Sequence, residues 1–125
     1  NIPEAETLSG VKINNFEDIK INLRILFQMG CEYVLIKGGH FNEDYSIDYL
    51  YNGKELLEFS EPRIKTNNIH GTGCTLSSAI AASLSLGLNV EEAVEKSKDY
   101  ITEALKKSFK VGKGNSPVNH FHSYW

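Results

Sequence analysis

Residues 70–87 read HGTGCTLSSAIAASLSLG, two glycines followed by a run rich in alanine and serine. This composition predicts a helix that begins near Gly73 and ends before Gly87. The first N–H groups of a helix have no partner within it, and the helix dipole adds partial positive charge at the same end. Because the two glycines let the backbone turn sharply, these N–H groups can point outward. We therefore predict an anion site, most naturally for a phosphate, at Gly71–Thr75.

Cys74 lies in the first turn of this predicted helix, where the same field favours its thiolate form. A thiolate there is a candidate base or nucleophile beside the anion site. On spacing alone, the pattern fits equally an ordinary tight turn in which Cys74 is a small buried hydrophobic residue. It does not fit a P-loop, because no Gly-Lys-Ser/Thr follows, and it lacks the third glycine of a dinucleotide-binding fingerprint.

Helices and strands alternate on both sides of this segment. The expected helices cover a turn between Pro3 and Gly10 and residues 15–28, 73–86 and 89–109, with N-caps at Asn15 and Asn89 and a C-cap at Gly30. The expected strands cover residues 33–36, 47–51 and 56–59, with a further extended segment over 64–69. Asn52-Gly53 predicts a β-hairpin, and the continuous apolar run 33–36 is typical of a strand buried in a parallel sheet. The sequence thus predicts an α/β fold with parallel pairing plus a β-hairpin.

Composition and charge exclude several classes of protein. The chain has 125 residues, of which 41% are hydrophobic and 23% charged, as in one soluble globular domain. Its net charge of −3 and pI of about 5.8 argue against nucleic acid or an anionic membrane as partners. No apolar run reaches the roughly 18–20 residues of a membrane span. Two cysteines alone do not exclude a disulfide, but the different settings of Cys31 and Cys74 favour reduced thiols and a cytoplasmic protein.

Two further segments contain candidate binding residues. Lys37 ends the expected buried strand, at the edge where α/β sheets bind ligands, so it is a candidate to offset phosphate charge. The pattern fits equally well a lysine that has no role in phosphate binding and simply extends from the end of a strand beside an ordinary turn. Asn1 and Glu4 offer an amide and a carboxylate three positions apart, which can hold Mg²⁺ or its waters. An N-terminal turn with an acid at the start of a helix accounts for the same pair.

Four segments together carry a resemblance to a known family. They are the strings NIPEAE at residues 1–6, VLIKGGH at 34–40, TNNIHGTGCT at 66–75 and GKGNSPVNHF at 112–121. In this order they resemble the C-terminal half of hydroxymethylpyrimidine/phosphomethylpyrimidine kinases of thiamine biosynthesis, in the ribokinase-like superfamily. The resemblance spans essentially the whole chain. It implies a single partial domain over 1–125, the C-terminal part of a three-layer αβα fold with a mostly parallel sheet plus a β-hairpin.

The resemblance also implies a reaction and a role for each candidate residue. The reaction is ATP- and Mg²⁺-dependent transfer of a phosphoryl group to a small pyrimidine substrate, first to its hydroxymethyl group and then to the monophosphate. Residues 71–73 would form the anion hole, and Cys74 would be the catalytic base. Lys37 would lie near the phosphates of the nucleotide. Residues 112–120 would lie toward its adenine. By the same resemblance Asn1 and Glu4 would organise Mg²⁺, Gly71, Thr72 and Gly73 would hold the transferred group, and Cys74 would take the proton. We also expect a homo-oligomer.

Some features depart from the family pattern. Ser116 stands where the family usually has glycine, and residues 67–69 make the segment before His70 one residue longer. Family members are about twice this length, so we expect residue 1 to be an internal position and the isolated chain to be inactive. A pyridoxal kinase sharing the Gly-Thr-Gly-Cys loop is the first alternative and a thiazole kinase the second. A non-catalytic phosphate- or nucleotide-binding module is an alternative of another class.

Overall fold

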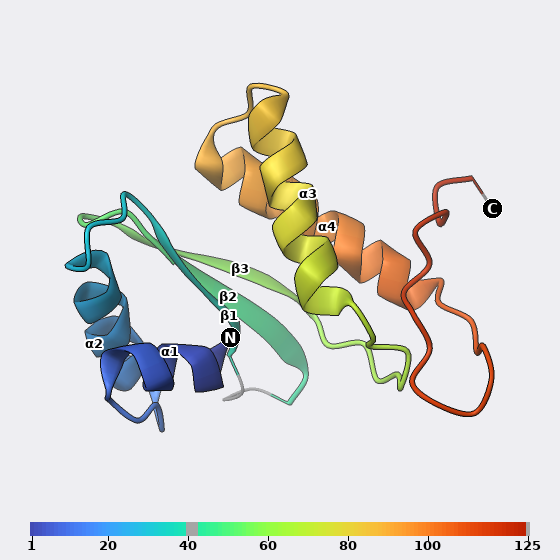
Figure 1. Cartoon of the computed structure of the whole chain (residues 1–125), viewed down its shortest axis with the longest axis horizontal. Helices are drawn as coiled ribbons and strands as arrows, with labels where there is room; N and C mark the ends of the chain where they lie inside the picture. The colour runs from blue at the N-terminus through green and yellow to red at the C-terminus, as the bar shows by residue number, and fades with distance from the viewer. Residues whose placement is uncertain (40–42, 125) are drawn as a thin grey trace. The chain divides into compact units, whose positions relative to one another are not determined.

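The computed structural model describes residues 1–39 and 43–124 and divides the chain into two compact units, Asn1–Arg63 and Ile64–Trp125 (Figure 1). The first unit contains two helices and a three-stranded sheet, and the second contains two helices and the C-terminal tail. The predicted α/β class is confirmed. None of the helices in the described ranges is long and apolar enough to span a membrane.

The two helices of the first unit are α1 (Ile2–Ser9) and α2 (Phe16–Phe27). As predicted, α1 ends at Gly10 and α2 begins after Asn15, whose side chain accepts a hydrogen bond from the N–H of Asp18. The predicted C-cap at Gly30 is wrong, because α2 ends at Gln28 and two further turn hydrogen bonds separate it from Gly30.

The sheet contains β1 (Val34–Gly39), β2 (Tyr45–Tyr51) and β3 (Leu56–Pro62), in the order β1-β2-β3. Both pairs of neighbouring strands are antiparallel, so the predicted parallel pairing is wrong for the strands described here. The physical reason is the length of the connections. Residues 40–44 join β1 to β2 and residues 52–55 join β2 to β3, whereas a parallel pair needs a crossover of a dozen or more residues.

The predicted hairpin around Asn52-Gly53 is confirmed as β2 and β3. The side chain of Asn52 accepts hydrogen bonds from the N–H groups of Lys54 and Glu55. A side chain at Gly53 would overlap the ring of Phe27 on α2, so the turn also needs glycine for space. Helices α1 and α2 both contact β1. The core of this unit consists of Ile2, Ala5, Ile13, Ile19, Leu23, Val34, Ile36 and Tyr49.

The second unit is built on α3 (Thr72–Ser85) and α4 (Val90–Lys106), which pack against each other (Figure 1). Asn89 caps α4 as predicted, with Glu92 completing the capping box. The helix ends three residues before the predicted position. Residues 64–69 form no strand, and His70 makes only an isolated parallel bridge to Pro117. The predicted extended segment is therefore wrong, since no neighbouring strand in the described residues pairs with it.

Candidate anion site and adjoining cavity

Helix α3 begins with N–H groups that make no hydrogen bond within the part of the chain that the structure describes. Gly71 is its N-cap, with a φ of 81°, a conformation that glycine adopts without strain. The N–H and the hydroxyl of Thr72 both donate to the carbonyl oxygen of Ile69, and the N–H of Thr75 closes the first helical turn onto Gly71. Between them, the N–H groups of Gly73 and Cys74 have no acceptor among residues 1–39 and 43–124, and no side chain caps the helix. They can bind an anion.

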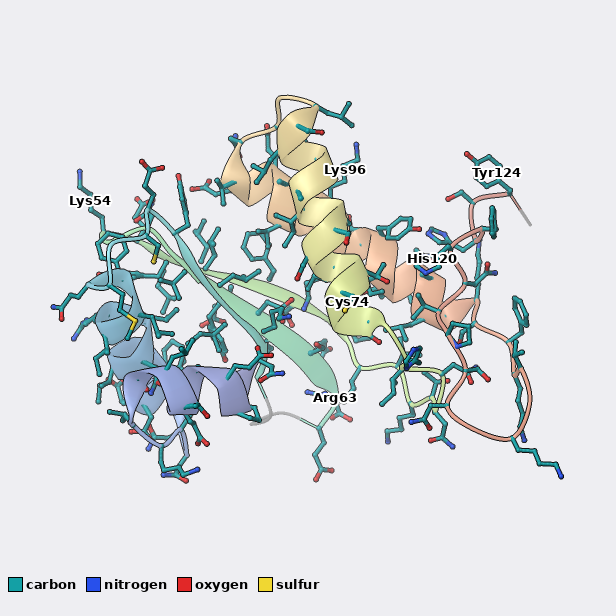
Figure 2. The ribbon with its side chains drawn as sticks, viewed as in Figure 1. Lys54, Arg63, Cys74, Lys96, His120 and Tyr124 are labelled. Carbon is teal, nitrogen blue, oxygen red and sulfur yellow. The ribbon has the colours of Figure 1, made fainter. Side chains whose placement is uncertain are left out.

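A cavity of about 510 Å³ adjoins this helix start and lies wholly within the second unit. Figure 2 shows Cys74 at the beginning of α3, Lys96 on α4 and His120 on the tail. The wall is largely apolar, with one ammonium group at Lys96. Its lining residues are Cys74, Thr75, Ser78, Ala79, Ala82, Ser83, Leu86, Lys96, Ser97, Tyr100 and His120. The arrangement suits a ligand with an anionic end near α3 and a flat, less polar end farther along the groove.

Cys74 is exposed and forms no disulfide, and the same holds for Cys31. The interpretation of Cys74 as a small buried hydrophobic residue is therefore wrong. Because Cys74 is the third residue of α3 and lines the cavity, its sulfur is accessible to a ligand bound at the helix start.

Asn1 and Glu4 form the capping box of α1. The side-chain oxygen of Asn1 accepts from the N–H of Glu4 at 2.9 Å, and the Glu4 carboxylate accepts from the nitrogen of Asn1. This hydrogen bond holds the pKa of Glu4 below its ordinary value, and the charge of Lys37 acts in the same direction. The capping interpretation of this pair is confirmed. The capping box still leaves lone pairs of the Glu4 carboxylate available to a cation or its waters.

The predicted site residues fall into two groups. Asn1, Glu4 and Lys37 belong to the first unit, where Asn1 and Glu4 form the capping box of α1, and Gly71–Cys74 form the start of α3 in the second. His40, which belongs to the segment that carries the family resemblance, lies outside the described residues.

Sequence reasoning missed several residues of these regions. Lys96, Ser97 and Tyr100 line the cavity from α4, and nothing in their helical spacing distinguishes them from an ordinary helix face. Asp48 is 3% exposed and contacts the backbone next to Lys37. An acid within the apolar run Ile47–Leu50 was the signal that could have identified it.

Comparison with known proteins decides the family. The phosphomethylpyrimidine kinase family matches residues 1–119. The chain belongs to that family. A hydroxymethylpyrimidine/phosphomethylpyrimidine kinase of Aquifex aeolicus is 46% identical over 114 residues, and one of Bacillus subtilis is 39% identical over 122. These matches cover 91% and 97% of this chain and 45% of each relative, so the chain spans less than half the length of these kinases.

Solved structures also match this chain over nearly its whole length. The pyridoxal kinase of Staphylococcus aureus in complex with AMP-PCP matches with a TM-score of 0.91 and 35% identity, over 96% of this chain and 45% of that protein. An ADP complex of Bacillus subtilis pyridoxal kinase matches with a TM-score of 0.91 and 32% identity, over 99% of this chain and 49% of that protein. The predicted ribokinase-like fold is confirmed.

Proposed function

We propose that the protein carrying this chain transfers the γ-phosphoryl group of ATP to hydroxymethylpyrimidine and then to the resulting monophosphate, in thiamine biosynthesis. The observation that carries the proposal is the pair of unpartnered N–H groups at Gly73 and Cys74, which adjoin the 510 Å³ cavity. The names of the curated relatives support the acceptor, and the AMP-PCP and ADP complexes of the solved relatives support the nucleotide.

In this proposal the start of α3 stabilises the charge of the transferring phosphoryl group. Phosphoryl transfer depends on alignment and charge stabilisation more than on covalent help from the protein. N–H groups that are fixed before the reaction supply this without reorganisation. Gly71 sets the turn that exposes them, and Thr72 anchors the turn to Ile69. Gly73 and Cys74 are then the two donors that face the phosphoryl oxygens.

The nucleotide is proposed to lie along the cavity in the second unit. Its phosphates would be at the Cys74 end, and its base would lie among the apolar side chains of α3 and the residues from α4 and the tail. The side chains of Ala79 and Ala82 leave room for a flat ring, and Lys96 adds a positive charge to the wall. This placement agrees with the expectation that residues 112–120 lie toward the adenine, because His120 lines the cavity.

From the family resemblance, Asn1 and Glu4 are proposed to hold Mg²⁺, and Lys37 is proposed to bind phosphate. The described residues contain no cluster of three or more acidic, histidine or cysteine side chains that could hold a metal. Mg²⁺ commonly needs only one or two carboxylates when phosphates and waters complete its shell, so Glu4 with the Asn1 amide fits it. Bound Mg²⁺ would neutralise phosphate charge. Lys37 would add a further positive charge.

Cys74 is proposed as the base for the first transfer. The hydroxymethyl acceptor must lose a proton as its oxygen attacks, and the accessible sulfur of Cys74 at the helix start is the candidate to take it. The monophosphate acceptor is already largely ionised near neutral pH, so the second transfer needs little help from a base.

A pyridoxal kinase is the second candidate, because the solved structures matched here at 32–35% identity are pyridoxal kinases. Curated pyrimidine kinases reach 39–46% identity over nearly the same residues, which favours the pyrimidine acceptor. A binding module without turnover is the alternative of another class.

The test is an ATP-dependent phosphorylation assay of the complete protein that carries these residues, with hydroxymethylpyrimidine, its monophosphate and pyridoxal as acceptors. We expect turnover with both pyrimidines and a much lower kcat/KM with pyridoxal. Gly73→Pro removes one N–H donor at a first-turn position that tolerates proline, and it should lower kcat by about 10²–10³-fold. The matched control is Glu91→Pro, at the same helical position of α4. Preference for pyridoxal would replace the proposed acceptor, and nucleotide binding without turnover would favour the binding module.

A further inference from the structure

The strands β1 and β2 lose their regular pairing at Lys37. Ile36 pairs with Tyr49 and Gly39 pairs with Ile47, so two residues of β1, Lys37 and Gly38, lie opposite the single residue Asp48 of β2. This is the arrangement of a β-bulge, in which the extra residue is left without its partner in the ladder. Bulges are common beside functional sites, where they direct a side chain.

Asp48 supplies the partner that the bulge lacks. One oxygen of its carboxylate accepts the N–H of Gly38 at 2.6 Å. The side chain is 3% exposed, so this hydrogen bond is shielded from water, and hydrogen bonds to an ionised acceptor are stronger than those between neutral groups. Gly38 has a φ of 69°, which makes it the residue at which the backbone of the bulge turns.

Lys37 is held between two fixed neighbours. On one side Ile36 is 2% exposed in the core of the first unit, and on the other Gly38 is bound by Asp48. The charge of Lys37 also helps to lower the pKa of Glu4 at the start of α1. Lys37 can keep this position only while the backbone of the bulge is fixed.

We propose that Asp48 is a positioning residue for phosphoryl transfer: its buried carboxylate holds the bulge at Gly38 and thereby fixes the position of Lys37. This inference rests on the proposed function, in which Lys37 acts on the phosphates. It assigns to a buried acid a task that it performs through the backbone of β1.

The first experiment measures hydrogen exchange of the Gly38 amide in the complete protein and needs no substrate. Asp48→Val has no acceptor but keeps a side chain that suits a strand, and it should speed the exchange of this amide by at least about tenfold. Asp48→Asn keeps an oxygen acceptor and should have a much smaller effect. Glu58→Val is the matched control, an exposed acid on the adjoining strand β3. Unchanged exchange of Gly38 in Asp48→Val and in Asp48→Ala would overturn the proposal.

The second experiment tests whether Asp48 acts through Lys37. KM for ATP and kcat are measured for Asp48→Val, Lys37→Ala and the double variant. If Asp48 only positions Lys37, the double variant should match Lys37→Ala within about twofold, and Asp48→Asn should recover most of the activity lost in Asp48→Val. Losses that multiply would mean two independent roles and would overturn the inference.

The two experiments separate this inference from the proposed function. An unmodified protein without any ATP-dependent turnover would overturn the proposed function. The exchange of Gly38 would still decide whether Asp48 holds the bulge, because that measurement depends on no substrate. If Asp48→Val does not fold, Asp48→Ala and Asp48→Asn carry both comparisons.

Discussion

At the scale of single residues, Cys74 shows how position in a helix defines chemistry. A cysteine has no fixed role, and the same residue is usually buried and inert. Here it is exposed, it lines the cavity, and its own N–H is one of the two unpartnered donors at the start of α3. The start of α3 therefore places an N–H donor that can bind an anion next to a sulfur that can accept a proton.

Replacing Cys74 with alanine should separate the two proposed transfers. Alanine keeps the backbone N–H and removes only the sulfur, so the anion site remains. We expect kcat for the hydroxymethyl acceptor to fall by about 10²-fold or more, as is usual for loss of a general base, and kcat for the monophosphate acceptor to fall by less than about tenfold. Both are measured as steady-state rates with the complete protein. Cys31→Ala is the control, since Cys31 is also exposed and free. Equal losses for both acceptors would argue against a base role.

At the scale of elements, the end of α4 explains how an irregular tail is held in place. The last carbonyl groups of a helix have no partner within it. The backbone N–H of Asn119 donates to the carbonyl oxygen of Ala104, and its side-chain amide donates to that of Lys107. Ser116 closes the loop that precedes Asn119, because its hydroxyl accepts a hydrogen bond from the N–H of Val111 and donates one to the carbonyl oxygen of Val111. These bonds bring His120 to the cavity.

Asn119→Ala should loosen the tail while leaving α4 intact. The variant loses both side-chain hydrogen bonds of Asn119, the one donated to the carbonyl oxygen of Lys107 and the one accepted from the N–H of Phe121. We expect a loss of about 1–3 kcal/mol in the free energy of unfolding. Denaturant unfolding of the complete protein measures this. KM for ATP should rise as His120 becomes less well placed, with little change in kcat. Asn115→Ala, in the exposed loop before Ser116, is the control and should alter neither quantity. A stability equal to that of the unmodified protein would contradict the capping role.

At the scale of the whole molecule, the sheet leaves strand edges and apolar surface open. The order β1-β2-β3 puts β1 at an edge of the sheet, where unpaired backbone groups can pair with another chain. A cavity of about 360 Å³ lies along this strand and is bordered by the exposed side chains of Leu8 and Met29. The relatives that match this chain are more than twice as long.

We expect the 125-residue polypeptide on its own to self-associate and to lack ATP-dependent turnover. Light scattering over a concentration series measures the association, and the phosphorylation assay measures the turnover. Leu8→Lys places a charge at the open surface and should weaken the association, whereas Val111→Lys, which changes an exposed apolar residue of the other unit, should not. A monomer at all concentrations would contradict the first expectation. Turnover by the isolated polypeptide would contradict the second.

The sequence by itself determined the local features, because their causes lie within a few residues. A helix start that binds anions is predicted from Gly71 and Gly73 before a run of small residues. Two helix caps are predicted at Asn15 and Asn89, and a turn is predicted at Asn52-Gly53. The structure confirms the two caps and the turn. Four ordered segments also predicted the family. Local patterns could not determine strand direction, since an apolar run such as 33–36 suits either kind of pair and only the short connections make it antiparallel.

Only the tertiary structure decided which candidate groups are available and what supports them. It showed that the hydroxyl and N–H of Thr72 are already used, that Cys74 is exposed, and that the cavity beside it draws residues from α3, α4 and the tail. It also joined Asp48 to Gly38, ten positions earlier in the chain. The physical reason is that hydrogen-bond partners and burial depend on contacts between distant segments, and these form only when the chain folds.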